Sequence, residues 1–177
     1  MNINIIKRKV KNIRIEVKGE NVKIVIPAWI TDEKTVLKKT MSWIEKAVKR
    51  QIELHQRAES LKLYDHTPEN FKAYVKRKVN EFSKELNVKI FEIKFRKMKR
   101  KWGSCSSKGK ITINTLCRYL PYNLIDYIVF HEVLHRKFMN HGKDFKNAIK
   151  NKFIKWKELE ENLKLYSIKI QANTKNT

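Results

Sequence analysis

The amino-acid sequence predicts a mixed α+β protein, and the periodicity of its apolar residues carries that prediction. Apolar and polar residues alternate over 13–26, 88–95 and 111–115, which indicates β-strands because successive side chains of a strand point to opposite faces. Longer segments between and after these stretches place apolar residues three or four positions apart, which indicates helices. No βαβ unit is repeated along the chain, so the class is α+β rather than α/β.

The first part of the chain is expected to form a β-hairpin followed by a long helix. Two alternating runs within 13–26 flank the turn-forming residues 19–21, and residues 3–10 are a candidate for a further strand. Thr31 is the expected N-cap of the helix, because its hydroxyl can accept a hydrogen bond from a free amide of the first turn. This helix is expected to reach about Leu63.

The second part of the chain is expected to combine helices with short strands. Thr67 followed by Pro68 is typical of a helix start, because proline fits the first helical position. The elements expected after that helix are a strand over 88–95, a turn over 102–109, a strand over 111–115, a helix opened by Pro121 and a last helix from about Lys143 towards Tyr166.

Composition places the chain among globular proteins of the reducing cytoplasm. It has 177 residues, 41% of them hydrophobic, which is enough to build a core. No run approaches the roughly 20 apolar residues of a membrane span, and the N-terminus lacks a signal-peptide pattern. We therefore expect a cytoplasmic protein without membrane attachment. The two cysteines, Cys105 and Cys117, form no CxxC pair, so we expect free thiols rather than a zinc finger or a disulfide.

The net charge of +23 raises the question of a nucleic-acid partner. A basic excess of this size is typical of proteins that bind polyanions. Most of the basic residues are lysines, however, and they are scattered through every segment, whereas phosphate recognition favours arginine. Binding of nucleic acid through a basic surface and a simple compositional bias are equally compatible with this pattern.

The most informative segment is His131-Glu132-Val133-Leu134-His135 within the predicted third helix. Two histidines four positions apart lie on one face of a helix, so both imidazoles can reach a single metal ion. Glu132 can then reach a water molecule in the open coordination position without becoming a ligand. The surrounding residues are apolar, so these three polar side chains need a reason to be there. The pattern predicts a catalytic metal site, with Zn²⁺ as the best match for imidazole.

A third ligand is needed, because catalytic zinc usually has three protein ligands and one open position. His141 is the leading candidate, provided that the helix ends between His135 and His141. Asn140 can adopt a left-handed conformation there, and Gly142 adds conformational freedom. The alternatives lie on the following helix, and they are Glu158, Glu160 and Glu161.

These residues predict hydrolysis of a carbonyl compound by metal-bound water. Zinc lowers the pKa of that water to about 7, and Glu132 accepts the proton as the water attacks. Glu132 would later pass the proton to the leaving amine. A further donor is expected to stabilise the charge on the carbonyl oxygen. The candidates for that donor are Arg118, Tyr119, Tyr122 and Tyr127.

Two segments of the chain, 100–114 and 120–145, resemble the YgjP-like metallopeptidases, which are relatives of the SprT-like proteins. The similarity includes Trp102-Gly103-Ser104-Cys105, Gly109, Asn114, Pro121, Asp126-Tyr127, the HExxH segment, Asn140-His141 and Phe145. The resemblance implies a minimal zincin-like fold with His131, His135 and His141 as zinc ligands and Glu132 as the catalytic residue. It also implies a zinc-dependent metallopeptidase that acts on peptides or proteins.

On this basis we expect three segments: a hairpin with a long helix over 1–66, a zincin-like catalytic region over 67–170 and a disordered tail over 171–177. The first two segments are expected to form one compact domain. The resemblance also implies that the strand before the active-site helix borders the cleft, so that a substrate could pair with residues 110–115 as an added strand. The residues expected to line the substrate site are Trp102, Ser104, Cys105, Ile113, Asn114 and Tyr127.

Two other activities are weighed against the peptidase. One is hydrolysis of a nucleotide phosphoanhydride, for which basic residues 94–101 could hold the anion, although the chain has no glycine-rich phosphate loop. The other is a DNA-associated protease of the SprT-like type, which would also use the basic surface. A non-catalytic nucleic-acid-binding module with structural zinc is disfavoured, because three ligands beside a glutamate indicate an open site.

Overall fold

The computed structural model describes residues 1–174 and divides the chain into two compact units, with the boundary between Ser60 and Leu61. The sequence placed this boundary at 66/67 and expected both parts to form one compact domain. The described residues contain five α-helices and two three-stranded sheets, which agrees with the predicted α+β class. None of the helices in residues 1–174 is both long and apolar enough to cross a lipid bilayer.

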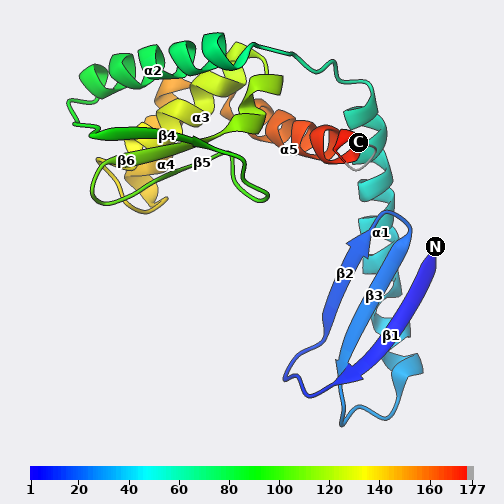
Figure 1. Ribbon diagram of the computed structural model, residues 1–177. Coiled ribbons are helices and arrows are strands. Elements are labelled where there is room, and N and C mark those ends of the chain that lie inside the picture. The colour runs from blue at the N-terminus through cyan, green and yellow to red at the C-terminus, as the bar shows by residue number, and fades with distance from the viewer. Residues whose placement is uncertain (175–177) are drawn as a thin grey trace. The chain divides into compact units, whose positions relative to one another are not determined.

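The N-terminal unit contains a three-stranded sheet and one long helix (Figure 1). Its elements are β1 (Asn2–Arg8), β2 (Arg14–Lys18), β3 (Asn21–Pro27) and α1 (Glu33–Glu59). Strands β2 and β3 form the expected antiparallel hairpin, with Lys18 opposite Asn21. Gly19 has a φ of 59° in the turn, a conformation that favours glycine. Strand β1 adds to the other side of β3 in parallel, so the sheet order is β1-β3-β2.

The core of the N-terminal unit forms between β3 and α1. Val22, Ile24 and Ile26 alternate along β3 and are buried against Ile44 and Val48 of the helix. The N-cap of α1 is Asp32 rather than the predicted Thr31, and the Asp32 carboxylate accepts a hydrogen bond of 3.0 Å from the amide of Thr35. An ionised carboxylate caps better here because it also complements the positive end of the helix dipole. The helix ends at Glu59, short of the predicted Leu63.

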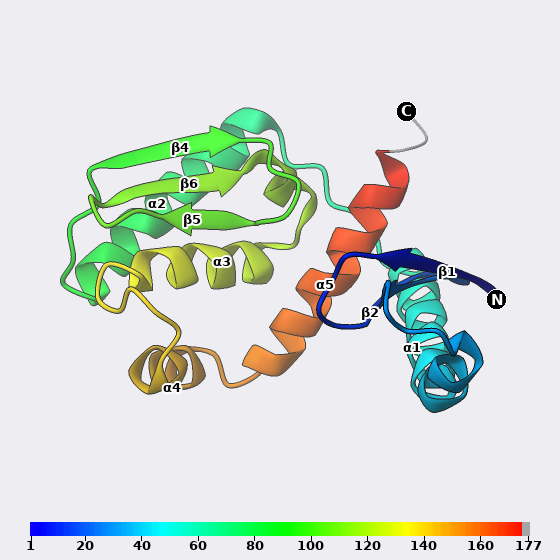
Figure 2. The ribbon, with the colours of Figure 1, turned by 90° about the horizontal axis from the view of Figure 1, so that it is seen from below.

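The second unit contains the remaining helices and the second sheet (Figure 2). Helix α2 begins at Pro68, and the Thr67 hydroxyl caps it by accepting a hydrogen bond from the amide of Asn70, as predicted. The elements are α2 (Pro68–Glu85), β4 (Glu92–Arg96), β5 (Gly103–Cys105), β6 (Lys110–Asn114), the 3₁₀-helix η1 (Thr115–Tyr119), α3 (Tyr122–Leu134), α4 (Lys143–Lys152) and α5 (Trp156–Asn173).

The second sheet has the order β4-β6-β5, with β6 parallel to β4 and antiparallel to β5. Helices α2 and α3 cover one of its faces (Figures 1 and 2). Ile111 and Ile113 of β6 are fully buried in the core between these layers. Helix α3 is buried on nearly every side because it packs against α2, β5, β6 and α5. The sheet and its covering helices therefore hold α3 rigidly at the centre of the unit.

Several elements of the second unit differ from the sequence prediction. The strand predicted over 88–95 is shorter, because β4 covers Glu92–Arg96. The stretch 102–109, predicted as a turn, contains the short strand β5 before the turn itself. The predicted last helix is two helices, because Phe153 has extended dihedral angles that end α4 before α5 begins. Helix α5 continues to Asn173, three residues into the predicted disordered segment 171–177, and residues 175–177 of that segment lie outside the described residues.

Candidate active site

The C-terminal end of α3 positions three residues of the HExxH segment. His131 and His135 are one helical turn apart and both line a cavity of about 630 Å³. Glu132 lines the same cavity and is 7% exposed. The helix ends at Leu134, with His135 as its C-cap. The break that the sequence analysis required between His135 and His141 is therefore present.

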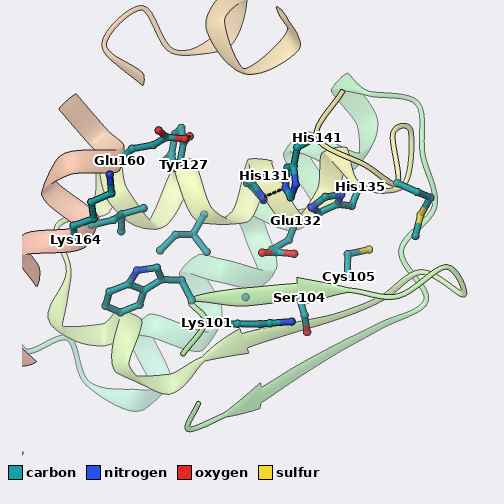
Figure 3. A pocket seen from close by; sticks show the side chains of 15 residues that line it. Lys101, Ser104, Cys105, Tyr127, His131, Glu132, His135, His141, Glu160 and Lys164 are labelled. Carbon is teal, nitrogen blue, oxygen red and sulfur yellow. Dashed lines mark hydrogen bonds between the residues drawn. The ribbon is translucent and has the colours of Figure 1, made fainter. Parts of the chain in front are cut away.

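The turn after α3 returns the chain to the two histidines. His141 lies just before α4, and its Nε2 atom is 3.0 Å from Nε2 of His131 (Figure 3). The expected left-handed conformation of Asn140 is not found, since Asn87 is the one non-glycine residue with positive φ in the described part of the chain. The Asn140 side chain instead accepts a hydrogen bond of 3.2 Å from the amide of Gly142. This local side-chain turn makes a left-handed residue unnecessary.

The three histidines converge on one point. One potential ligand nitrogen from each lies within 4.8 Å of the other two. Phe145, buried at the start of α4, contacts all three imidazoles, with ring centroids 4.7 to 4.9 Å from theirs. The Phe145 ring packs against the three imidazoles but does not line the cavity, whereas all three histidines do. Packing of α4 thus fixes the three rings at once.

The chemistry of the cluster fits a zinc ion. Burial lowers the pKa of His131 to about 4 and also lowers the pKa of His135, so both are neutral with free lone pairs at neutral pH. The Nδ1 atom of His135 donates a hydrogen bond of 3.1 Å to the carbonyl of Phe138, which leaves Nε2 for a metal. Ligand nitrogens around tetrahedral zinc are about 3.4 Å apart, given zinc–nitrogen bonds of about 2.05 Å. The Nε2 atoms of His131 and His141 are 3.0 Å apart, and the three potential ligand nitrogens lie within 4.8 Å of one another.

The glutamates considered as alternative ligands are engaged elsewhere or are outside the cluster. Glu160 accepts a hydrogen bond of 3.0 Å from the Tyr127 hydroxyl, and Glu158 forms an ion pair with Lys155. In residues 1–174, the three histidines are the one group of three or more potential ligands close enough to share a metal.

Glu132 packs directly on the backbone of β5. A Cβ atom placed on Gly103 would lie 2.6 Å from Cγ and 2.8 Å from Oε1 of Glu132, so only glycine leaves room for this side chain. Burial raises the pKa of Glu132 to about 7, while the positive charge of Lys101 acts to lower it. The carboxyl group can therefore both accept and release a proton near neutral pH.

Most of the residues predicted to line the substrate site are found in the wall of this cavity. Trp102, Ser104, Cys105 and Tyr127 line it together with Glu132 and the histidines (Figure 3). Both cysteines are free, and burial raises the pKa of Cys105, so its thiol remains protonated near neutral pH. A cysteine nucleophile is therefore disfavoured.

Two of the predicted lining residues lie elsewhere. Ile113 is fully buried in the core, and Asn114 is 2% exposed and faces away from the cavity of Glu132. Asn114 instead organises the loop between β4 and β5. Its Nδ2 donates hydrogen bonds of 2.7 Å to the carbonyls of Met98 and Lys101, and its Oδ1 accepts one of 3.1 Å from the amide of Met98.

Four residues line the cavity without having been predicted to do so, and they are Lys101, Gly103, Glu160 and Lys164. Glu160 was considered only as a metal ligand, and Lys101 only as part of the basic run 94–101. Gly103 had a recognisable signal, because a glycine in or beside a strand often marks the close approach of another group. The other three depend on how α5 and the β4–β5 loop pack, and no local pattern encodes that packing.

Of the four candidate donors to a carbonyl oxygen, Tyr127 is the one that lines the cavity. Its hydroxyl donates to Glu160, and burial raises its pKa. Arg118 instead pairs with Asp65 at 2.8 Å and stacks on Tyr119, whereas Tyr122 stacks on His66.

The expected pairing of a substrate strand with residues 110–115 is not available. Strand β6 is the central strand and already pairs with β4 and β5 along its length, so it has no free edge. Strand β5 is an edge strand, and all three of its residues line the cavity. The free edge beside Glu132 therefore belongs to residues 103–105.

Comparison with known proteins agrees with this site. The sequence pattern of the family described as YgjP-like, metallopeptidase domain, matches residues 48–166. An uncharacterised protein of Methanocaldococcus jannaschii is 37% identical over 84 residues, which are 44% of this chain and 74% of that protein.

Two solved structures are also similar. The metallopeptidase zymogen jannalysin of Methanocaldococcus jannaschii is 33% identical, with a TM-score of 0.45 over 51% of this chain and 86% of its own. The metallopeptidase zymogen abylysin of Pyrococcus abyssi is 22% identical, with a TM-score of 0.46 over 50% of this chain and 90% of its own.

Proposed function

Because the chain belongs to the YgjP-like metallopeptidase family, we propose that it is a zinc-dependent peptidase with a zincin-like catalytic region. His131, His135 and His141 hold the metal, and Glu132 is the general base. The observation that carries the proposal is the convergence of three imidazoles beside a buried carboxyl group on the wall of one cavity. Three protein ligands leave a coordination position open, which is the arrangement of catalytic rather than structural zinc.

The metal would supply Lewis acidity to a water molecule and to the carbonyl of the scissile bond. Glu132 would accept the proton of the attacking water at its carboxylate and later give that proton to the leaving amine. A pKa near 7 suits both steps. Contact with Gly103 holds the carboxyl group in place, so little reorganisation is needed when the proton moves.

Substrate binding is proposed to use the free edge of β5. An extended peptide that pairs with residues 103–105 would pass directly over Glu132, because Gly103 lies against that side chain. Main-chain hydrogen bonds would then hold the peptide irrespective of its sequence. Tyr127 is the candidate donor to the carbonyl oxygen, once its hydroxyl is released from Glu160.

The other activities suggested by the sequence gain no support. The comparisons do not favour nucleic-acid binding, and the family match concerns a peptidase domain. A cytoplasmic location stays a prediction.

The test is cleavage of unstructured proteins and fluorescence-quenched peptides by the zinc-loaded protein, with the cut sites located by mass spectrometry. Glu132→Gln should reduce cleavage by about 10³-fold or more while zinc binding persists, because only the proton acceptor is lost. Glu158→Gln is the matched control, since it makes the same chemical change outside the cavity. Equal cleavage by Glu132→Gln and the unsubstituted protein would refute the assigned role.

A further inference from the structure

The cavity of Glu132 contains two lysines that have no carboxylate partner. Lys101 precedes β5, and Lys164 projects from α5 on the opposite wall (Figure 3). Both side chains are exposed, and neither forms an ion pair within the described residues. The cavity has two carboxyl groups, Glu132 and Glu160. Neither carboxyl group forms an ion pair with Lys101 or Lys164 within the described residues, although the charge of Lys101 acts on Glu132 and Glu160 precedes Lys164 by one turn of α5.

A second cavity of about 660 Å³ adjoins the first. Lys101 and Trp102 line both, which makes them the boundary between the two spaces. The remaining charged residues of the second cavity are Lys97, Lys99 and Arg100, and no carboxylate lines it. Polar residues at the C-terminal end of α5 also line it, and they are Ser167, Gln171 and the C-cap Thr174.

The basic loop of the second cavity is held in a fixed shape rather than being a solvated run of charges. Asn114 is buried beneath it and binds the backbone of Met98 and Lys101 through three hydrogen bonds. A fourth bond of 2.8 Å joins the amide of Asn114 to the carbonyl of Trp102. The loop therefore presents its cations from a preorganised backbone, which lowers the entropic cost of binding an anion.

The position of these cations relative to the reacting centre follows from β5. Glu132 lies against Gly103, and Lys101 is two residues before it. The chain bends at Trp102, so Lys101 lies at most about 7 Å from Gly103 along the backbone. A peptide that pairs with β5 and extends beyond its N-terminal end would therefore reach Lys101 within about two residues of the scissile bond, at the boundary with the second cavity.

We propose that the two cavities select substrates that carry a carboxylate group about two or more residues from the scissile bond. This carboxylate lies towards the N-terminal end of β5, and Lys101 and Lys164 are its principal binding partners. The inference rests on the proposed peptidase function and adds the substrate class. The second cavity is lined by cations and by no carboxylate, and such a surface attracts anionic ligands before contact, so the preference should weaken as salt screens it.

The carboxylate could come from an acidic side chain or from the C-terminus of a peptide. The experiment therefore compares three quenched peptides of one backbone sequence on the zinc-loaded protein. The first has glutamates flanking the cut site and blocked ends, the second has glutamines there and blocked ends, and the third has glutamines and a free C-terminal carboxylate. We expect kcat/KM to be at least about tenfold higher for the first or the third than for the second.

Charge reversal tests the two lysines directly. The double variant Lys101→Glu with Lys164→Glu should abolish or invert the ratio of kcat/KM between the carboxylate-bearing peptides and the blocked glutamine peptide. The ratio is the readout because Lys101 also acts on Glu132, so its reversal lowers cleavage of all three peptides. The matched control is Lys150→Glu with Lys157→Glu, which changes the net charge equally through residues outside both cavities. If both double variants reduced the preference equally, overall charge rather than this site would be responsible.

Failure of the inference differs from failure of the proposed function. Equal kcat/KM for all three peptides in the unsubstituted protein would overturn the carboxylate preference and leave the peptidase intact. Absence of cleavage of any peptide or protein, with zinc bound, would overturn the peptidase proposal itself. A preference for acidic peptides that is unaffected by the cavity variants would also contradict the inference, because it would assign the selectivity to other residues.

Discussion

The contact between Gly103 and Glu132 gives the sharpest prediction for catalysis. In Gly103→Ala, the new methyl group would lie 2.6 Å from Cγ of Glu132, whereas ordinary contacts begin at 3.4 Å. Either the Glu132 side chain or β5 must move by about 0.8 Å. The histidines contact Phe145 and one another rather than Gly103, so the metal site should be unaffected.

The expected loss can be estimated from this displacement. A misplacement of about 1 Å in a catalytic group can lower the rate by about 100-fold. Overpacking a buried position also costs about 1–3 kcal/mol of stability. We therefore expect kcat/KM of Gly103→Ala to fall by about 100-fold, zinc content to stay stoichiometric and the free energy of unfolding to fall by a few kcal/mol at most.

A double-mutant cycle separates this mechanism from general damage. If Gly103→Ala acts through Glu132, it should lower kcat/KM little further in a Glu132→Gln background, because the group that it displaces no longer functions. The assay is cleavage of a quenched peptide at fixed zinc, with zinc content measured on the same samples. Full activity in Gly103→Ala would refute the reasoning, as would additive losses in the double variant or loss of zinc.

Three further predictions concern the supports of the site. Phe145→Ala removes the ring that contacts all three histidines, so it should lower the free energy of unfolding by about 3–5 kcal/mol and weaken zinc binding. Denaturant unfolding and competition with a zinc indicator measure these two effects. Unchanged zinc affinity would contradict the supporting role of Phe145. Asn114→Leu leaves backbone groups of the β4–β5 loop without partners, so the free energy of unfolding in urea should fall by about 1–3 kcal/mol. An unchanged free energy of unfolding would mean that the loop holds its shape without Asn114. Removing metal with a chelator should abolish cleavage and lower the melting temperature, and added zinc should restore both, whereas activity that survives chelation would exclude a metal mechanism.

The sequence predicted that the histidines would cluster because the relevant pattern is local. A helix places His131 and His135 on one face through its own geometry, and the apolar residues around them indicate burial. The position of His141 was also predictable, since the polar residues 140–142 mark the end of the helix. The details of that turn were not, because a side-chain hydrogen bond of Asn140 replaced the expected backbone conformation.

Features that depend on tertiary packing could not be predicted in the same way. The alternation of 111–115 identifies a strand but does not reveal whether it is central or at an edge. The structure makes β6 central, which moves the free edge to β5. Asn114 illustrates the same limit, because the sequence cannot distinguish a polar residue that faces substrate from one that holds a loop of the main chain.

The central claim is that three histidines hold a catalytic metal, and the most direct test is the zinc content of the purified protein and of His141→Ala. His55→Ala is the matched control, because His55 is exposed on α1 and bonds to Gln51 of its own helix. We predict about one zinc ion per chain in the unsubstituted protein and in His55→Ala, with a large loss in His141→Ala. Full zinc retention by His141→Ala, or no zinc uptake by the unsubstituted protein, would contradict the account.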